Sequence, residues 1–306
     1  PPDPPLPPAP PLPPRPPRTV FPTRVGTLAG VESQARKMPN EAPPEPPPVG
    51  REDQAIRDRM ATWAVRDAEQ WAERDGDLTI PWAEAEGHLA IVIDDVGREL
   101  DLFEDLLDLR FALTFSVLPG SVYATGVQQR LLVDDRRPRE ILLHLPMEPL
   151  DPAPMQLDVA EGEIFLLASD SPAQLRTKTL AALDRVPHAV GVNNHMGSKL
   201  SADPNAMEAI MPALHERGLF FLDSRTTPAT LAATQAERAG LPTLSRHVFL
   251  DHDPAPEAIR AALEQAVARS RSEPTVVIAH PSRAVVEVLA EELPRLHARG
   301  IGVYPA

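Results

Sequence analysis

The chain contains no cysteine among its 306 residues, which excludes disulfide bonds, cysteine-based zinc sites and thiol nucleophiles. It also lacks any run of about 18 apolar residues, so no segment is expected to span a membrane. Positive charge is scarce: 30 Lys and Arg against 44 Asp and Glu give a net charge of −14. This balance disfavours nucleic acid and anionic membranes as partners and leaves neutral sugars, peptides and metal cations.

Proline, in contrast, is abundant and unevenly placed: 19 of the 38 prolines lie in residues 1–48. Proline lacks a backbone donor and favours polyproline II structure, and this segment has too little apolar material to offset the entropy of ordering. We therefore expect residues 1–50 to be an extended, disordered spacer. A proline-rich ligand for an SH3-like partner is the alternative. Because the sequence starts at proline, we also expect that an N-terminal signal or membrane anchor has been removed.

Residues 51–87 are expected to form a charged amphipathic helix and a connector. Ile56, Met60, Trp63 and Trp71 fall roughly on one helical face. This face predicts that the helix packs on the outside of the domain that follows. A lid or a partner-binding helix is the alternative.

From residue 88 to 306, short apolar runs alternate with helical patterns, which indicates βα units and a parallel sheet. The expected strands are Leu89–Ile93, Phe111–Val117, Glu140–Leu145, Ala189–Val192, Leu219–Leu222, His247–Leu250, Thr275–Ala279 and Ile301–Tyr304. Continuous apolar runs such as residues 90–93 are typical of strands buried on both faces. We predict one α/β domain, an irregular (β/α) barrel of seven to eight parallel strands, with an open doubly wound sheet as the alternative.

Helix boundaries are marked by capping residues, prolines and glycines. Three pairs place a capping side chain before a proline suited to the first helical turn: Ser171-Pro172, Asp203-Pro204 and Thr227-Pro228. Three glycines are expected where helices end: Gly218, Gly240 and Gly300. Pro294 is expected to kink or break the last helix.

Polar residues follow the expected strands where an apolar core would end. They are Asp94-Asp95, His144, Asn193-Asn194-His195, Asp223, Asp251-His252 and His280. Because the carboxyl ends of parallel strands lie on one side of a barrel or sheet, these side chains should converge. Asp and His supply oxygen and nitrogen ligands for metals such as zinc. The sequence therefore predicts a metal-dependent hydrolytic site.

The Asp94-Asp95 pair sets a geometric condition on that site. Successive side chains of a strand point to opposite faces, so both carboxylates reach the site only where the strand ends or bulges. Gly97, shortly after the pair, permits such a turn.

Four motifs resemble those of the divergent polysaccharide deacetylases, which are distant relatives of the NodB-type carbohydrate deacetylases. The motifs are IDDVG at 93–97, HLPMEP at 144–149, NNHMGS at 193–198 and FLDSRT at 221–226. They occur in the family's order, and the resemblance covers residues 88–306. It implies a distorted (β/α) barrel in an exported protein, often behind an N-terminal membrane anchor.

The resemblance also implies roles for individual residues. Asp94 matches the general base and Asp95 a metal ligand of the NodB-type enzymes. His144 matches the first of their two metal-binding histidines, but Glu148 stands where the second is expected. We predict that His195, at the next strand end, replaces it, so that Asp95, His144 and His195 hold the metal.

The general acid of the NodB-type enzymes is matched by His280, which precedes a proline as it does in the family. Asp223 and Arg225 form either a structural ion pair or a pair that orients ligands. His252 is a further candidate without an assigned role. The residues predicted to bind substrate or orient ligands are Asn193, Asn194, Asp223, Arg225, Glu148 and His252.

The predicted function is that of a metal-dependent hydrolase, with zinc as the preferred metal. It would remove acetyl groups, on nitrogen or oxygen, from a polysaccharide or a peptidoglycan-type substrate in the periplasm or cell envelope, with a tether to the inner membrane. A metal hydrolase acting on a peptide or phosphoester is one alternative. A non-catalytic envelope protein that binds metal and glycan is the other, and Glu148 in place of a histidine favours it.

Overall fold

The computed structural model describes residues 77–134, 136 and 139–306. The expected spacer of residues 1–50 and nearly all of the expected helix before residue 77 lie outside the described residues and stay predictions. Among the helices of the described part, none combines the length and apolar character that crossing a membrane requires.

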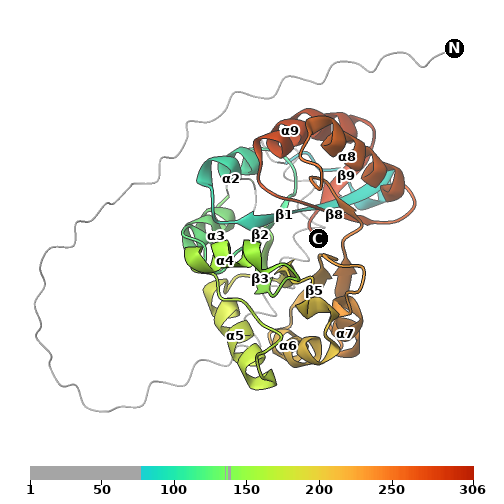
Figure 1. Cartoon of the computed structure of the whole chain (residues 1–306). Coiled ribbons are helices and arrows are strands. Elements are labelled where there is room, and N and C mark those ends of the chain that lie inside the picture. Colours follow the sequence, from blue (N-terminus) through green and yellow to red (C-terminus); the bar gives the residue numbers. More distant parts are fainter. Residues whose placement is uncertain (1–76, 135, 137–138) are drawn as a thin grey trace, which may run out of the picture.

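A parallel sheet forms the centre of the domain (Figure 1). The strand order is β6-β5-β4-β3-β2-β1-β8-β7, and β9 pairs with the first half of β1. The strands are β1 (Gly87–Val96), β2 (Thr114–Val117), β3 (Ile141–Met147), β4 (Gly191–Met196), β5 (Phe220–Asp223), β6 (Thr243–Ser245), β7 (Val248–Phe249), β8 (Thr275–Ala279) and β9 (Ile301–Tyr304).

The sheet is curled, as the connection between its two outermost strands shows. β6 pairs in parallel with β5, and β7 pairs in parallel with β8. Only Arg246 and His247 separate β6 from β7. One short segment therefore connects both ends of the hydrogen-bonded order, which gives the irregular (β/α) barrel predicted from the sequence and not an open doubly wound sheet.

Helices surround the outside of the curled sheet (Figure 1). They are α2 (Leu100–Leu107), α3 (Ala124–Leu132), α4 (Pro152–Glu161), α5 (Pro172–Arg185), α6 (Pro204–Glu216), α7 (Ala232–Arg238), α8 (Pro256–Ser270) and α9 (Arg283–Ala298), with short 3₁₀ helices η1 (Trp82–Glu84) and η2 (Leu200–Ala202). Ile91 and Ile93 belong to the large apolar cluster that involves these helices. Val92, between them, belongs to a smaller cluster with Leu142, Leu222, Val276 and Ile278. This alternation assigns the smaller cluster to the barrel interior.

The predicted helix caps are confirmed at α5 and α6. Ser171 accepts the backbone N–H of Gln174, and Asp203 accepts those of Asn205 and Ala206. The predicted glycines follow α6, α7 and α9 with positive φ at 62° for Gly218, 79° for Gly240 and 78° for Gly300.

One local prediction is wrong: Thr227 and Pro228 lie in a turn, and α7 begins only at Ala232. At Pro294, where a kink or a break was expected, α9 continues without a break. The strand β6 was not expected, because its residues are only half-buried and form no continuous apolar run.

Candidate metal centre and active site

The site continues the inward-facing rows of the barrel strands. On β1, Ala90 and Val92 line the interior cluster, and Asp94 is the next residue on that face. The same spacing of two residues leads from Leu142 to His144 on β3, and from Ile278 to His280 just after β8. Polar groups thus replace apolar ones at the carboxyl ends of the strands, where barrel enzymes carry their chemistry.

Asp95, His144 and His195 bring three possible ligand atoms within 4.8 Å of one another. Asp95 Oδ1 lies 2.9 Å from His195 Nδ1 and 3.2 Å from His144 Nε2. The two imidazole nitrogens are 3.1 Å apart. The three side chains come from β1, β3 and β4, His144 from the middle of β3 and the other two from the last two residues of their strands. The structure therefore brings together the three residues that were predicted to hold the metal.

A chain of hydrogen bonds sets the tautomer of His144. Asn193 Nδ2 donates to Asp94 Oδ1 at 2.8 Å, so the amide oxygen of Asn193 faces His144. His144 Nδ1 lies 2.8 Å from that oxygen, which can only accept. The Ser116 hydroxyl donates to the same oxygen. His144 Nδ1 therefore carries a proton, and Nε2 faces the centre.

A second contact sets the tautomer of His195. Its Nε2 lies 2.7 Å from Asp158 Oδ2, a carboxylate on α4, and therefore carries a proton. The other ring nitrogen, Nδ1, then faces the centre. Asp95 Oδ1 is buried and faces the same point. Once His195 gives up its second proton to a metal, the site can offer three ligand atoms to one ion. One carboxylate oxygen and two imidazole nitrogens are a donor set that fits zinc.

Asp95 reaches this point through an irregularity in β1. By strand alternation its side chain should point away from the barrel interior, opposite to Asp94. The pairing with β2 shifts register between Ile93 and Val96, and Asp95 has a φ of 54°. Two other non-glycine residues with positive φ, Met196 and Arg225, lie at the ends of β4 and after β5. Backbone strain in the described part thus gathers around the candidate site.

The two neighbouring carboxylates differ in their electrostatics. Burial raises the pKa of Asp94, and the nearby His144, His280 and Asn193 only partly oppose that effect. Burial also acts to raise the pKa of Asp95, but His195 and His144 outweigh it and hold that pKa well below its usual range. Asp95 is therefore ionised, while Asp94 binds a proton more readily than an exposed aspartate.

His195 and His280 hold protons tightly when no metal is present. Burial acts to lower the pKa of His195, but Asp95 and Asp158 together raise it to about 9. For His280, burial is outweighed by Asp251, Asp95 and Asp94, which also raise the pKa to about 9. His280 Nδ1 lies 3.4 Å from Asp251 Oδ2, and that same oxygen accepts the His280 backbone N–H at 2.9 Å.

Glu148, the residue at the place of the family's second histidine, lies outside the group of possible ligands. Its carboxylate pairs with Lys199 Nζ at 2.7 Å and accepts the backbone N–H of Ala168 at 2.6 Å. Both contacts hold it at the base of the loop that follows β3. His252 is exposed, and its nearest aromatic neighbour is Phe249, with ring centres 6.4 Å apart.

Asp223 and Asn194 make contacts that stabilise the loops around the site. Asp223 accepts the Arg225 backbone N–H at 2.8 Å and the Thr230 hydroxyl at 3.0 Å. Within the described residues no ion pair joins the Asp223 and Arg225 side chains. Asn194 accepts the Ser224 backbone N–H at 2.9 Å and donates to the Met196 carbonyl at 2.8 Å. Their predicted roles in binding substrate stay predictions, since local contacts account for their positions.

Four residues of the site were not predicted. Asp158 and Arg98 lie on α4 and in the loop after β1, and Ser116 and Ser224 lie on or just after β2 and β5. The serines share the inward-facing parity of the other site residues, so strand alternation could have identified them. Asp158 had no comparable signal, because it comes from a helix and not from a strand end.

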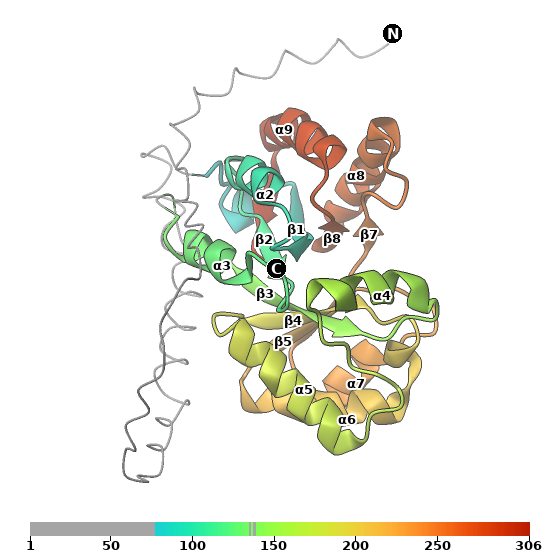
Figure 2. The same cartoon turned by 60° about the vertical axis from the view of Figure 1, so that its left-hand side comes forward.

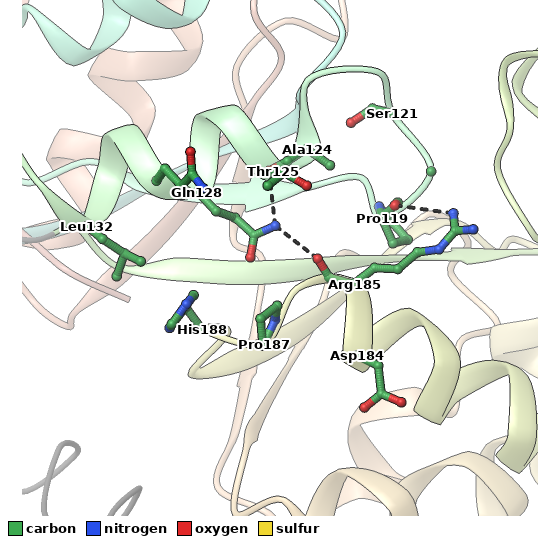
Figure 3. A pocket seen from close by; sticks show the side chains of 12 residues that line it. Pro119, Ser121, Ala124, Thr125, Gln128, Leu132, Asp184, Arg185, Pro187 and His188 are labelled. Atoms are coloured by element: carbon green, nitrogen blue, oxygen red, sulfur yellow. Dashed lines mark hydrogen bonds between the residues drawn. The ribbon is translucent and has the colours of Figure 1, made fainter. Parts of the chain in front are cut away.

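A pocket of about 470 Å³ opens elsewhere, between α3 and the C-terminal end of α5 (Figure 3). Among its lining residues are Thr125, Gln128, Arg185 and His188. None of the predicted metal ligands lines it. The convergent polar chemistry of the described residues therefore lies at the strand ends and not in this pocket.

Comparison with known proteins agrees with the motifs and the fold. Residues 91–306 match the model of the divergent polysaccharide deacetylase family. The chain is 35% identical over 206 residues to the uncharacterized protein YibQ of Escherichia coli K12, a match that covers 67% of this chain and 62% of YibQ. It is 33% identical over 213 residues to an uncharacterized protein of Haemophilus influenzae, covering 69% of this chain and 73% of that one. The chain thus spans less than two thirds of the length of YibQ.

The fold resembles a solved structure as well. The uncharacterized protein ATU2773 of Agrobacterium tumefaciens C58 superposes with a TM-score of 0.63 at 23% identity, over 78% of this chain and 93% of that chain. The family match covers residues 91–306, which contain all four motifs, and the resemblance seen in the sequence is confirmed. The chain therefore belongs to the divergent polysaccharide deacetylase family.

Proposed function

We propose that this protein is a metal-dependent deacetylase that removes acetyl groups from a glycan of the cell envelope. The observation that supports it most is the convergence of three possible ligand atoms on one point, beside a buried carboxylate and a protonated histidine. Hydrolysis of an acetamide or acetyl ester needs a nucleophilic water, a base and an acid, and these groups correspond to those needs.

Asp95, His144 and His195 would hold the ion. A divalent metal such as zinc supplies a water acidified to a pKa near 7 and polarises the acyl oxygen. The residues of this chain hold the ligand nitrogens in orientations that face the ion. Asn193 does so for His144 and Asp158 for His195, at contacts of 2.8 Å and 2.7 Å.

Asp94 takes the role of general base. One oxygen, Oδ1, is held by Asn193 at 2.8 Å, and the other, Oδ2, lies 3.7 Å from His144 Nε2 and so faces the centre. Because burial raises its pKa, Asp94 accepts a proton from the attacking water more readily than an exposed aspartate does.

His280 takes the role of general acid. Asp251 orients its ring and helps to raise its pKa to about 9, so the imidazole is protonated at neutral pH. It can donate that proton to the leaving nitrogen or oxygen as the bond to the acyl carbon breaks. The products are acetate and the free amine or hydroxyl of the sugar. The net charge of −14 favours a neutral glycan over a polyanion.

The proposal is tested by acetate release from chitooligosaccharides and peptidoglycan with the zinc-loaded protein. We expect Asp94→Asn to lose about 10²–10⁴-fold in rate while keeping its metal, because only the base is removed. Glu99→Gln, an exposed neighbour, should match the wild type. His195→Ala should lose the metal itself, whereas His188→Ala, which changes an exposed histidine, should keep it.

Other outcomes separate the alternatives. Unchanged metal content in His195→Ala would show that the ligand set is wrong. Bound metal without acetate release from any acetylated glycan would favour a binding protein, and cleavage of a phosphoester or peptide would favour a different hydrolase. The location in the periplasm or cell envelope is part of the proposal, and fractionation of cells that carry the tagged protein tests it.

A further inference from the structure

The helix α4 shows an inverted pattern of burial. Asp158 is its buried residue, whereas Leu157 and Val159 on either side are 70% and 51% exposed. A helix that docked through apolar packing would bury the leucine and valine instead. Figure 2 shows α4 apart from the helices α5 and α6 that follow it. Polar contacts of Asp158 therefore hold the middle of α4 against the barrel.

The segment that follows α4 is held against the barrel by contacts of its own. Leu166, after α4, pairs with Met147 at the end of β3. Glu163 accepts the backbone N–H of Gly120 with both carboxylate oxygens, at 2.9 and 3.0 Å. These contacts hold the segment after α4 in place. The contacts of Asp158 hold α4 itself.

Asp158 belongs to a closed ring of four side chains. Its Oδ2 contacts His195 Nε2 at 2.7 Å, and its Oδ1 pairs with an Arg98 terminal nitrogen at 2.6 Å. The other terminal nitrogen of Arg98 lies 3.2 Å from Asp95 Oδ2. Asp95 Oδ1 and His195 Nδ1 then face each other across the metal centre at 2.9 Å. Two of the three ligands are thus tied to one carboxylate on α4.

We propose that Asp158 is a positioning residue that holds His195, and through Arg98 Asp95, in the geometry that binds metal, and that these contacts also hold α4 over the centre. This inference rests on the metal centre of the proposed function. Asp158 fixes the His195 proton on Nε2 and leaves Nδ1 free for the ion, as carboxylates behind metal-bound histidines do. The two histidine ligands beside it are buried: His195 is 5% exposed and His144 is 1% exposed. The third ligand, Asp95, keeps 19% of its side chain exposed.

The same contacts make the position of α4 and the geometry of the ligands interdependent. Asp158 seats this helix on His195 at a contact of 2.7 Å. Movement of α4 away from the barrel would break the contact that orients His195. Asp158 therefore couples the position of α4 to the order of the metal ligands.

The test measures zinc affinity by competition with a chelator and, separately, the hydrogen exchange of α4 amides in the metal-free full chain. Asp158→Asn removes the charge that holds both partners, and we expect about 10–100-fold weaker zinc binding and faster exchange across α4. The matched control is Glu161→Gln, on the same helix, whose carboxylate lies 3.5 Å from Arg98 but has no contact with His195. It should leave zinc affinity within about twofold of the wild type, since the His195 contact is kept.

The two readouts keep the proposals apart. If the wild type binds no zinc, the metal centre of the proposed function fails, and α4 exchange still decides whether Asp158 holds the helix. Wild-type zinc affinity in Asp158→Asn would overturn the positioning role, and unchanged α4 exchange would overturn the anchoring role. An equal loss of zinc affinity in Glu161→Gln would also overturn the assignment, because it would reflect charge on the helix and not the His195 contact. Circular dichroism shows whether each variant remains folded.

Discussion

Asp94 and Asp95 are adjacent in the chain, yet their surroundings prepare them for different tasks. Asp94 is 2% exposed and hydrogen-bonded to a neutral amide, so burial dominates and raises its pKa. Asp95 faces two imidazoles that overcome the effect of burial and keep its carboxylate charged. The raised pKa of Asp94 suits a general base, and the lowered pKa of Asp95 suits a metal ligand.

The protonation of His195 and His280 predicts how the metal-free protein responds to pH. Both pKa values are raised to about 9 in the folded state, above about 6.5 in an unfolded chain. The resulting stability is fully present below pH about 6.5 and is lost as pH rises through about 9. We therefore expect the melting temperature of the chelator-treated protein to fall between pH 7 and 9.

His195→Asn should flatten this pH profile, since it removes one of the two titrating groups. A wild-type melting temperature that stays constant from pH 6 to 9.5 would contradict the prediction. Zinc-loaded protein provides the internal comparison, because an ion bound at His195 Nδ1 excludes the proton.

The residues of the site were predictable where they end strands. Asp95, His144 and His195 follow apolar runs of strand length, and their convergence follows from parallel topology. Alternation within a strand separates Asn193, which contacts Asp94, from Asn194, which stabilises a loop. Asp158 could not be predicted in this way, since its role depends on how the loop after β3 folds back.

At the level of elements, the bulge in β1 turns a strand end into part of the candidate metal site. A regular strand would direct Asp94 and Asp95 to opposite faces. The register shift after Ile93 and the left-handed backbone of Asp95 direct both toward the centre. Gly97, with a φ of 115°, ends the bulge in a conformation that other residues rarely adopt.

Gly97→Ala is therefore expected to destabilise the protein by about 1–3 kcal/mol and to weaken zinc binding. Its new Cβ would also collide with the Ser121 side chain. Urea denaturation and chelator competition measure the two effects. Gly126→Ala is the matched control: this glycine lies within α3 with nothing near the new Cβ, so alanine should stabilise by about 0.5–1 kcal/mol. Equal destabilisation by both changes would rule out a special role for the Gly97 conformation.

The elements differed in how far the sequence could predict them. Buried strands were predicted from their apolar runs: β8 has the predicted bounds, and β1 contains the predicted run 89–93 but extends from Gly87 to Val96. β6 has three half-buried residues and is a strand because it pairs with β5. The local sequence gives no sign of this pairing. α4 has its polar residue buried and its apolar residues exposed, the opposite of the pattern by which surface helices are recognised.

Over the whole molecule, a buried ion pair fastens the start of the described domain to the barrel. Arg139, which precedes β3, contacts both oxygens of Asp77 at 2.5 and 2.7 Å and lies 3.3 Å from Asp134. Nearby, the Tyr304 hydroxyl donates to the Ile80 carbonyl at 2.9 Å. The chain before β1 is thus joined to β9 and to the loop before β3.

Arg139→Met should destabilise the folded state by about 3–5 kcal/mol, because it removes the guanidinium from two buried carboxylates. Denaturant unfolding measures this loss. Arg176→Met removes the exposed pair with Glu216 and should change stability little. Similar midpoints for Arg139→Met and the wild type would show that the buried pair adds no net stability.

The three proposed ligands lie at positions 95, 144 and 195 of the chain, on strands that meet only after the barrel has formed. An unfolded chain therefore has no such centre, and zinc would bind the folded form alone. At a free zinc concentration 100-fold above the dissociation constant, binding adds about 2.7 kcal/mol to folding. The zinc supply of the compartment would then govern how much of this protein survives proteolysis.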